Sequence, residues 1–108
     1  MKAIKILSEK QVFRSTFDKE VLVSVHVEIF RIPDPDSKNY PEGLRVSMVA
    51  YKNSAPDQII IVDCHPPKGP HFHSGLKEES FVWKSLDETY ALFWGLVETE
   101  FGAIEEVE

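Results

Sequence analysis

The sequence has 108 residues, of which 43% are hydrophobic and 28% charged, and its net charge is −6 at pH 7. This length and composition predict one folded domain with a single core and exclude a disordered chain. The acidic balance argues against broad, sequence-independent binding of nucleic acids, which requires a basic surface.

Cysteine use and apolar runs indicate the compartment. Cys64 is the only cysteine, so the chain cannot form an internal disulfide, and the first residues lack the pattern of a secretion signal. A reducing cytoplasm is therefore the expected location. No apolar run approaches the length of about 18 residues that a membrane span requires, so we expect no membrane association.

The first third of the chain has the alternation that is typical of β-strands. Residues 1–8 predict an edge strand, because charged and apolar side chains alternate there, and residues 11–17 are a second short candidate. The longest strand pattern covers residues 21–32, with alternate valines on a core-facing side. His26 lies on the opposite, mixed side, where we expect a structural or solvated side chain.

The middle of the chain continues this pattern. A proline-rich loop at 33–43 leads into an alternating strand at 44–51, and a second turn follows at 52–57. Residues 58–64 are apolar on both faces, as expected of a central strand that a helix covers. The predicted arrangement is an antiparallel meander.

The C-terminal third predicts one amphipathic helix after a brief strand at 79–83. Ser85 is a candidate helix cap, since a carboxylate follows three positions later. Apolar side chains then recur at helical spacing: Leu86, Tyr90, Phe93, Val97 and Phe101. Gly102 predicts the end of the helix, and Gly95 predicts either a close approach to a strand or simple tolerance. Residues 103–108 form an acidic tail, expected to be a solvated, frayed end.

Together these elements predict a single α+β domain over residues 1–108. We expect a curved antiparallel sheet of about four to six strands, arranged as a meander, with one C-terminal helix packed across a face.

Residues 63–75 concentrate the side chains that can carry chemistry. His71 and His73 are two positions apart, so on a strand both rings project to one face, about 7 Å apart at the backbone, which suits two ligands of one metal ion. The candidates for a third ligand across the turn are Asp63, Cys64 and His65. The resulting hypothesis is a divalent metal site formed by His71, His73 and Asp63, and we expect no other cofactor.

General acid–base cleavage of a phosphodiester is the second chemistry that this stretch allows. The candidate proton-transfer groups are His65, His71 and His73. Lys68 or Arg45 would stabilise the charge that develops on the phosphoryl group. Cys64, at the end of an apolar strand, is expected to be buried and inert rather than a nucleophile.

The order of these parts over residues 20–102 has a counterpart in a known family. The parts that match are Val27 to Pro35, Leu44 to Tyr51, Asp63-Cys64-His65, Lys68-Gly69-Pro70-His71-Phe72-His73, and Phe81 before a Ser-Leu-Asp helix that carries Phe93-Trp94. In this order the chain resembles the TumE-type toxins of prokaryotic toxin–antitoxin systems.

This resemblance implies a small α+β domain, a toxic activity on RNA and an antitoxin partner, which in the family is often a DNA-binding protein encoded beside the toxin. The family's basic, histidine-rich turn corresponds to His65, Lys68, His71 and His73, and its acidic strand-end position to Asp63. The predicted function is therefore a toxin-like component with ribonuclease-like activity. The alternative is a non-enzymatic domain that binds a partner or forms a homodimer through an exposed strand or the aromatic helix.

Overall fold

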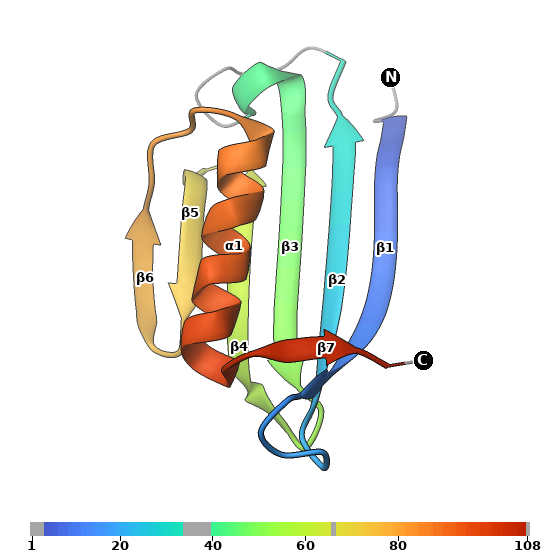
Figure 1. The fold of residues 1–108 in the computed structure, drawn as a ribbon. Coiled ribbons are helices and arrows are strands. Elements are labelled where there is room, and N and C mark those ends of the chain that lie inside the picture. Colours follow the sequence, from blue (N-terminus) through green and yellow to red (C-terminus); the bar gives the residue numbers. More distant parts are fainter. Residues whose placement is uncertain (1–3, 34–39, 66, 108) are drawn as a thin grey trace.

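A computed structural model describes residues 4–33, 40–65 and 67–107, which form a seven-stranded antiparallel sheet and one long helix (Figure 1). The strands are β1 (Ile4–Ser15), β2 (Leu22–Arg31), β3 (Leu44–Lys52), β4 (Ala55–His65), β5 (Gly69–Ser74), β6 (Lys77–Ser80) and β7 (Ile104–Glu106). The helices are the short 3-10 helix η1 (Pro41–Gly43) and α1 (Leu86–Phe101). The strand order is β6-β5-β4-β3-β2-β1-β7, so β1 to β6 form a meander and β7 closes the far edge.

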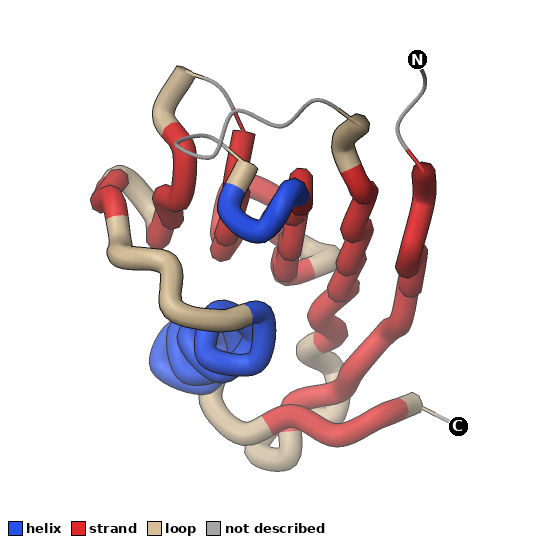
Figure 2. Tube along the Cα trace, turned by 90° about the horizontal axis from the view of Figure 1, so that it is seen from above, coloured by secondary structure: helices blue, strands red, loops and turns tan. Residues whose placement is uncertain are grey.

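The alternation of side chains along the strands divides the sheet into two faces. The helix α1 packs on β3 and β4, and Figure 2 shows the sheet curving around it. The core lies between them, and its fully buried side chains are Val23, Val46, Met48, Ala50, Ile60, Val62, Cys64, Phe93 and Val97. Strand register brings these residues to one face, because Val27 pairs with Met48 and Met48 with Val62. The predicted α+β meander with one C-terminal helix is therefore confirmed.

The ends of α1 follow the predicted signals. The Ser85 hydroxyl accepts a hydrogen bond of 3.0 Å from the Glu88 backbone N–H, which satisfies one of the free donors at the helix start. Gly102 ends the helix with a φ of 75°, a backbone conformation that glycine adopts without strain. A side chain at Gly95 would meet open space, so this glycine reflects tolerance and not a close approach to a strand.

Three details differ from the sequence prediction. The two expected N-terminal strands are one strand, β1, which pairs along its length with β2 through a register shift between Lys5 and Leu7. The strand expected at 79–83 lies at Lys77–Ser80, because a two-residue turn starts it earlier. The acidic tail, expected to be a frayed end, contributes the strand β7, in which Ile104 pairs with Ser15 of β1.

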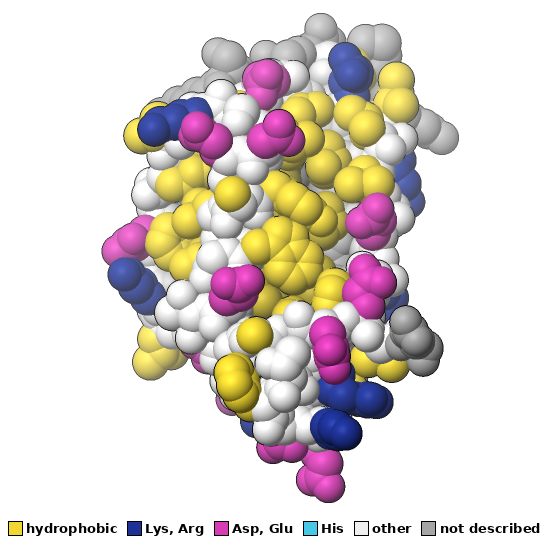
Figure 3. Space-filling model, viewed as in Figure 1, with side chains coloured by type: hydrophobic (Ala, Val, Ile, Leu, Met, Phe, Trp, Pro, Cys, Tyr) yellow, Lys and Arg dark blue, Asp and Glu magenta, His cyan; other side chains and the backbone are white. Residues whose placement is uncertain are grey.

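The helix leaves part of its own side of the sheet uncovered. Figure 3 shows hydrophobic side chains gathered between α1 and the strands β1 and β2, with acidic side chains around them. The opposite face of the sheet carries no helix in the described residues, and we call it the open face. Its central side chains are His26, Val49, Ile61, Asp63, His71 and His73, which alternate with the core residues along β2 to β5. Within the described ranges, no helix has both the length and the apolar content to cross a membrane.

Candidate functional site

Two tight hairpins position the histidines at one end of the sheet. Gly69, with a φ of 69°, starts β5 and pairs with the last residue of β4. Gly75, with a φ of 62°, is the first residue of the two-residue turn that joins β5 to β6, where a positive φ fits the right-handed twist of the strands. These turns set a register in which His73 lies directly opposite Glu78.

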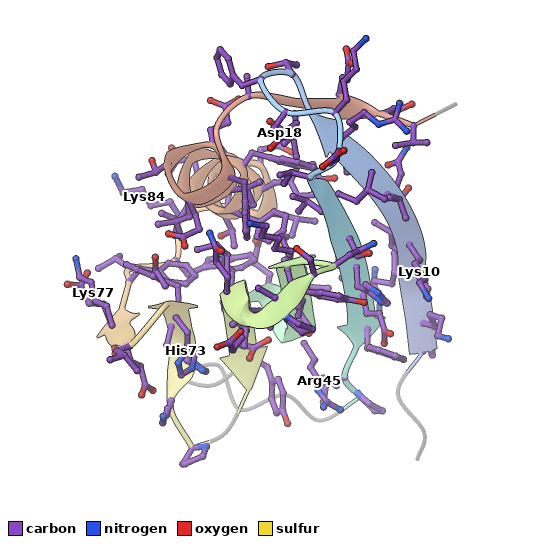
Figure 4. All side chains as sticks on the ribbon, turned by 90° about the horizontal axis from the view of Figure 1, so that it is seen from below. Lys10, Asp18, Arg45, His73, Lys77 and Lys84 are labelled. Atoms are coloured by element: carbon purple, nitrogen blue, oxygen red, sulfur yellow. The ribbon has the colours of Figure 1, made fainter. Side chains whose placement is uncertain are left out.

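Three side chains converge on the open face, and we call them the His–Glu cluster: His71, His73 and Glu78. One ligand atom from each lies within 4.8 Å of the other two. The two imidazole rings meet edge to face, with centroids 5.2 Å apart. The His73 Nε2 lies 3.8 Å from the Glu78 Oε1. The predicted convergence of His71 and His73 on one face is therefore confirmed, and Figure 4 shows His73 on the side of the sheet away from α1.

His71 is the fixed member of the cluster, since its side chain is only 3% exposed. Its Nδ1 lies 2.8 Å from the Gly69 carbonyl oxygen, which can only accept a hydrogen bond, so Nδ1 carries the proton. In the neutral ring the Nε2 is then the nitrogen that carries the lone pair. The Asp63 Oδ2 lies 4.0 Å from this Nε2, on the neighbouring strand.

His73 and Glu78 form the accessible part of the cluster, with side chains 31% and 40% exposed. The Lys68 ammonium forms an ion pair and hydrogen bond with the Glu78 Oε1. This hydrogen bond lowers the pKa of the Glu78 carboxyl, against an opposing effect of desolvation, and the charges of Lys68, His73 and His71 lower it further. Glu78 is therefore an ionised carboxylate at neutral pH, held between a cation and an imidazole.

The other predicted site residues lie apart from the cluster or outside the described side chains. His65 ends β4, but its side chain lies outside the described part of the structure. Arg45 is an exposed residue of β3, two strands from β5, although it also points to the open face (Figure 4). His26, which the sequence did not predict as a site residue, is three strands from His73, a separation of about 14 Å at the usual strand spacing.

Cys64 points to the core, on the face opposite to the cluster, and is fully buried. Burial raises the pKa of its thiol from 9.0 to about 12, and the neighbouring charge of Asp63 adds to the effect. A thiol that stays protonated and inaccessible is neither a nucleophile nor a metal ligand at neutral pH, as expected from its place at the end of an apolar strand.

Glu78 is the site residue that the sequence prediction missed. The metal hypothesis took its carboxylate from Asp63, whereas the carboxylate within 4.8 Å of both histidines belongs to Glu78. A signal for it was present, because Ser74-Gly75-Leu76-Lys77 can form a two-residue hairpin turn. Such a turn places the fifth residue after His73 directly opposite it.

No protein-family model matches this chain, and the comparisons find no significantly similar curated protein or solved structure. The resemblance to the TumE-type toxins stays a prediction.

Proposed function

We propose that this domain is the toxin-like component of a toxin–antitoxin pair and cleaves RNA by general acid–base catalysis at the His–Glu cluster. The observation that carries the proposal is the juxtaposition of an accessible imidazole, His73, and an ionised carboxylate, Glu78, beside the cation of Lys68. The choice of RNA as the substrate comes from the resemblance to the TumE-type toxins. The proposal places the protein in the cytoplasm, where RNA and an antitoxin are both present.

The proposed reaction uses the 2′-hydroxyl of the RNA as the nucleophile. Glu78 accepts the 2′-hydroxyl proton as the oxygen attacks the adjacent phosphorus, and protonated His73 donates a proton to the departing 5′-oxygen. The new bond joins phosphorus to the 2′-oxygen and the broken bond is that to the 5′-oxygen, so the products carry a 2′,3′-cyclic phosphate and a 5′-hydroxyl. Lys68 stabilises the negative charge on the phosphoryl oxygens.

His71 has a different role in this scheme. Its burial keeps it away from a substrate, while its edge contact with the His73 ring holds that ring toward Glu78. We therefore assign His71 as a positioning residue. The proton-transfer role of His65 stays a prediction.

The test is cleavage of a single-stranded RNA oligonucleotide by the purified protein in the presence of EDTA. His73→Ala and Glu78→Gln are each expected to lower the cleavage rate about 100-fold, the usual contribution of one acid–base group. His26→Ala is the matched control, because it removes a histidine from the same face about 14 Å away. A 2′-deoxy substitution at the cleaved position should abolish cleavage.

Two outcomes would contradict the proposal. One is equal cleavage by the His73→Ala and His26→Ala proteins. The other is the absence of any effect on growth or RNA when the unaltered protein is expressed alone in a bacterial host.

A second candidate function, binding of a partner protein, is favoured by an apolar groove on the helix side of the sheet. The groove has a volume of about 220 Å³, and its lining residues are Leu7, Glu9, Ile29, Leu86, Asp87 and Tyr90. Apolar side chains form its floor and carboxylates stand at its edge, as Figure 3 shows for this region. The adjoining helix α1 carries four acidic residues and no Lys or Arg.

This charge pattern selects the occupant. A second copy of the chain would bring another acidic helix into the groove, so like charges oppose a homodimer here. A basic amphipathic helix from a partner would bury its apolar stripe on Leu7 and Tyr90 and pair its cations with Glu9 and Asp87.

A synthetic Lys/Leu amphipathic helical peptide is the probe, and fluorescence anisotropy measures its binding. Tyr90→Ser should weaken binding at least 10-fold, whereas Val82→Ser, at an exposed apolar residue away from the groove, should leave it unchanged. Equal binding by both variants, or by a Glu/Leu peptide, would count against the groove.

A further inference from the structure

We propose that the His–Glu cluster is also a binding site for a divalent transition metal ion of the Zn²⁺ class. The ligands are His71 through Nε2, His73 through a ring nitrogen and Glu78 through a carboxylate oxygen. The inference uses the side chains of the proposed function but does not depend on RNA cleavage.

The distances bring the three ligand atoms close to a coordination sphere. In a tetrahedral zinc site with bonds of about 2.0–2.2 Å, the ligand atoms are about 3.4 Å apart. The separations here are at most 4.8 Å, so closure requires shifts of about 1 Å. His73 and Glu78 are partly exposed, so their side chains can rotate to make these shifts.

The hydrogen bonding of His71 prepares it as a ligand. Metal-binding histidines usually donate the proton of the other ring nitrogen to a carbonyl or carboxylate, which fixes the ring and directs the free electron pair at the metal. The 2.8 Å hydrogen bond from the His71 Nδ1 to the Gly69 carbonyl oxygen supplies this arrangement. The burial of His71 holds the ring in place, so the ring is fixed before a metal arrives.

The donor set selects the class of metal. Two imidazoles and one carboxylate suit Zn²⁺, Co²⁺ or Ni²⁺, whereas Mg²⁺ and Ca²⁺ prefer a shell of oxygen ligands. The thiol of Cys64 faces the core and contributes nothing. Three protein ligands leave a fourth position for water or substrate.

Lys68 opposes the metal, because its ammonium holds the same Glu78 oxygen. A metal ion has to displace the Lys68 ammonium from Glu78, and the positive charge of the ammonium then repels the bound ion. Removing the charge of Lys68 should therefore tighten metal binding. If the Lys68–Glu78 ion pair only stabilised the fold and no metal bound at Glu78, removing this charge would not increase metal affinity. A bound metal would also occupy Glu78, so the metal-bound form should lose the general base of the proposed reaction.

The experiment is a titration of the untagged, metal-free protein with Co²⁺, followed by visible absorption and by competition with Zn²⁺. We expect one ion per chain. His73→Ala and Glu78→Gln should each weaken binding at least 10-fold, Lys68→Met should tighten it several-fold, and His26→Ala should leave it unchanged. Asp63→Asn should weaken binding less than Glu78→Gln, which separates the ligand set proposed here from the one that the sequence predicts.

The inference is overturned if no Co²⁺ binds at millimolar concentration, or if His73→Ala and His26→Ala proteins bind it equally. Circular dichroism establishes that each variant is folded. RNA cleavage in EDTA without any Co²⁺ binding would remove the metal site and leave the proposed function standing. Co²⁺ binding without RNA cleavage would support the metal site and contradict the proposed function.

Discussion

The buried thiol of Cys64 should make the fold less stable at alkaline pH. Cys64 is fully buried among the side chains of the core, and its thiol has a pKa of about 12 against 9.0 for an ordinary thiol. Below about pH 9 the thiol keeps its proton in both the folded and the unfolded chain. Between about pH 9 and 12 the unfolded chain loses this proton while the folded chain holds it, so the free energy of unfolding falls as pH rises.

The size of this effect follows from the two pKa values. A pH of 10.5 lies 1.5 units above the pKa of 9.0 of the thiol in the unfolded chain, so that thiol is ionised, whereas the thiol in the folded chain is still protonated. Each unit corresponds to about 1.4 kcal/mol, so the thiol should destabilise the folded state by about 2 kcal/mol relative to pH 8.

Cys64→Ala isolates this contribution from the titration of lysines and tyrosines, which is the same in both proteins. Urea unfolding at pH 8.0 and 10.5 gives the free energy of unfolding of each protein. At pH 8.0 the variant should be less stable, because it leaves a small cavity in the core. At pH 10.5 the stability difference between the two proteins should have shifted by about 2 kcal/mol in favour of the variant. An unchanged difference at the two pH values would refute the burial argument.

Two further predictions concern the helix. Ser85→Ala removes the hydroxyl that accepts a hydrogen bond from the Glu88 N–H and should lower the free energy of unfolding by about 1 kcal/mol. Ser85→Asp keeps an acceptor at this position and should retain most of the stability. Equal losses for the two variants in urea unfolding would contradict the capping role. Phe93→Ala removes a fully buried ring and should cost about 3–5 kcal/mol, while Tyr90→Ala, at a ring that is 36% exposed on the same helix, should cost much less. Similar midpoints of thermal unfolding for these two variants would show that α1 does not bury the face described above.

Local patterns in the sequence determined the secondary structure and the division of the sheet into faces. Alternation along residues 21–32 identified the buried side of β2, and the signals at Ser85 and Gly102 identified the ends of α1. The step of two residues between His71 and His73 placed both rings on one face. These features depend on neighbours within a few residues, so the order of residue types is sufficient to predict them.

Tertiary structure decided which groups complete the candidate site. The sequence pointed to Asp63, which precedes the turn, but the register of β5 and β6 brings Glu78 beside His73 and Lys68 beside Glu78. The burial of His71, the pairing of β7 with β1 and the apolar groove beside α1 also join segments far apart in the chain. Such contacts depend on how strands align and how the sheet curves, because a shift of one residue in register would turn these side chains to the other face.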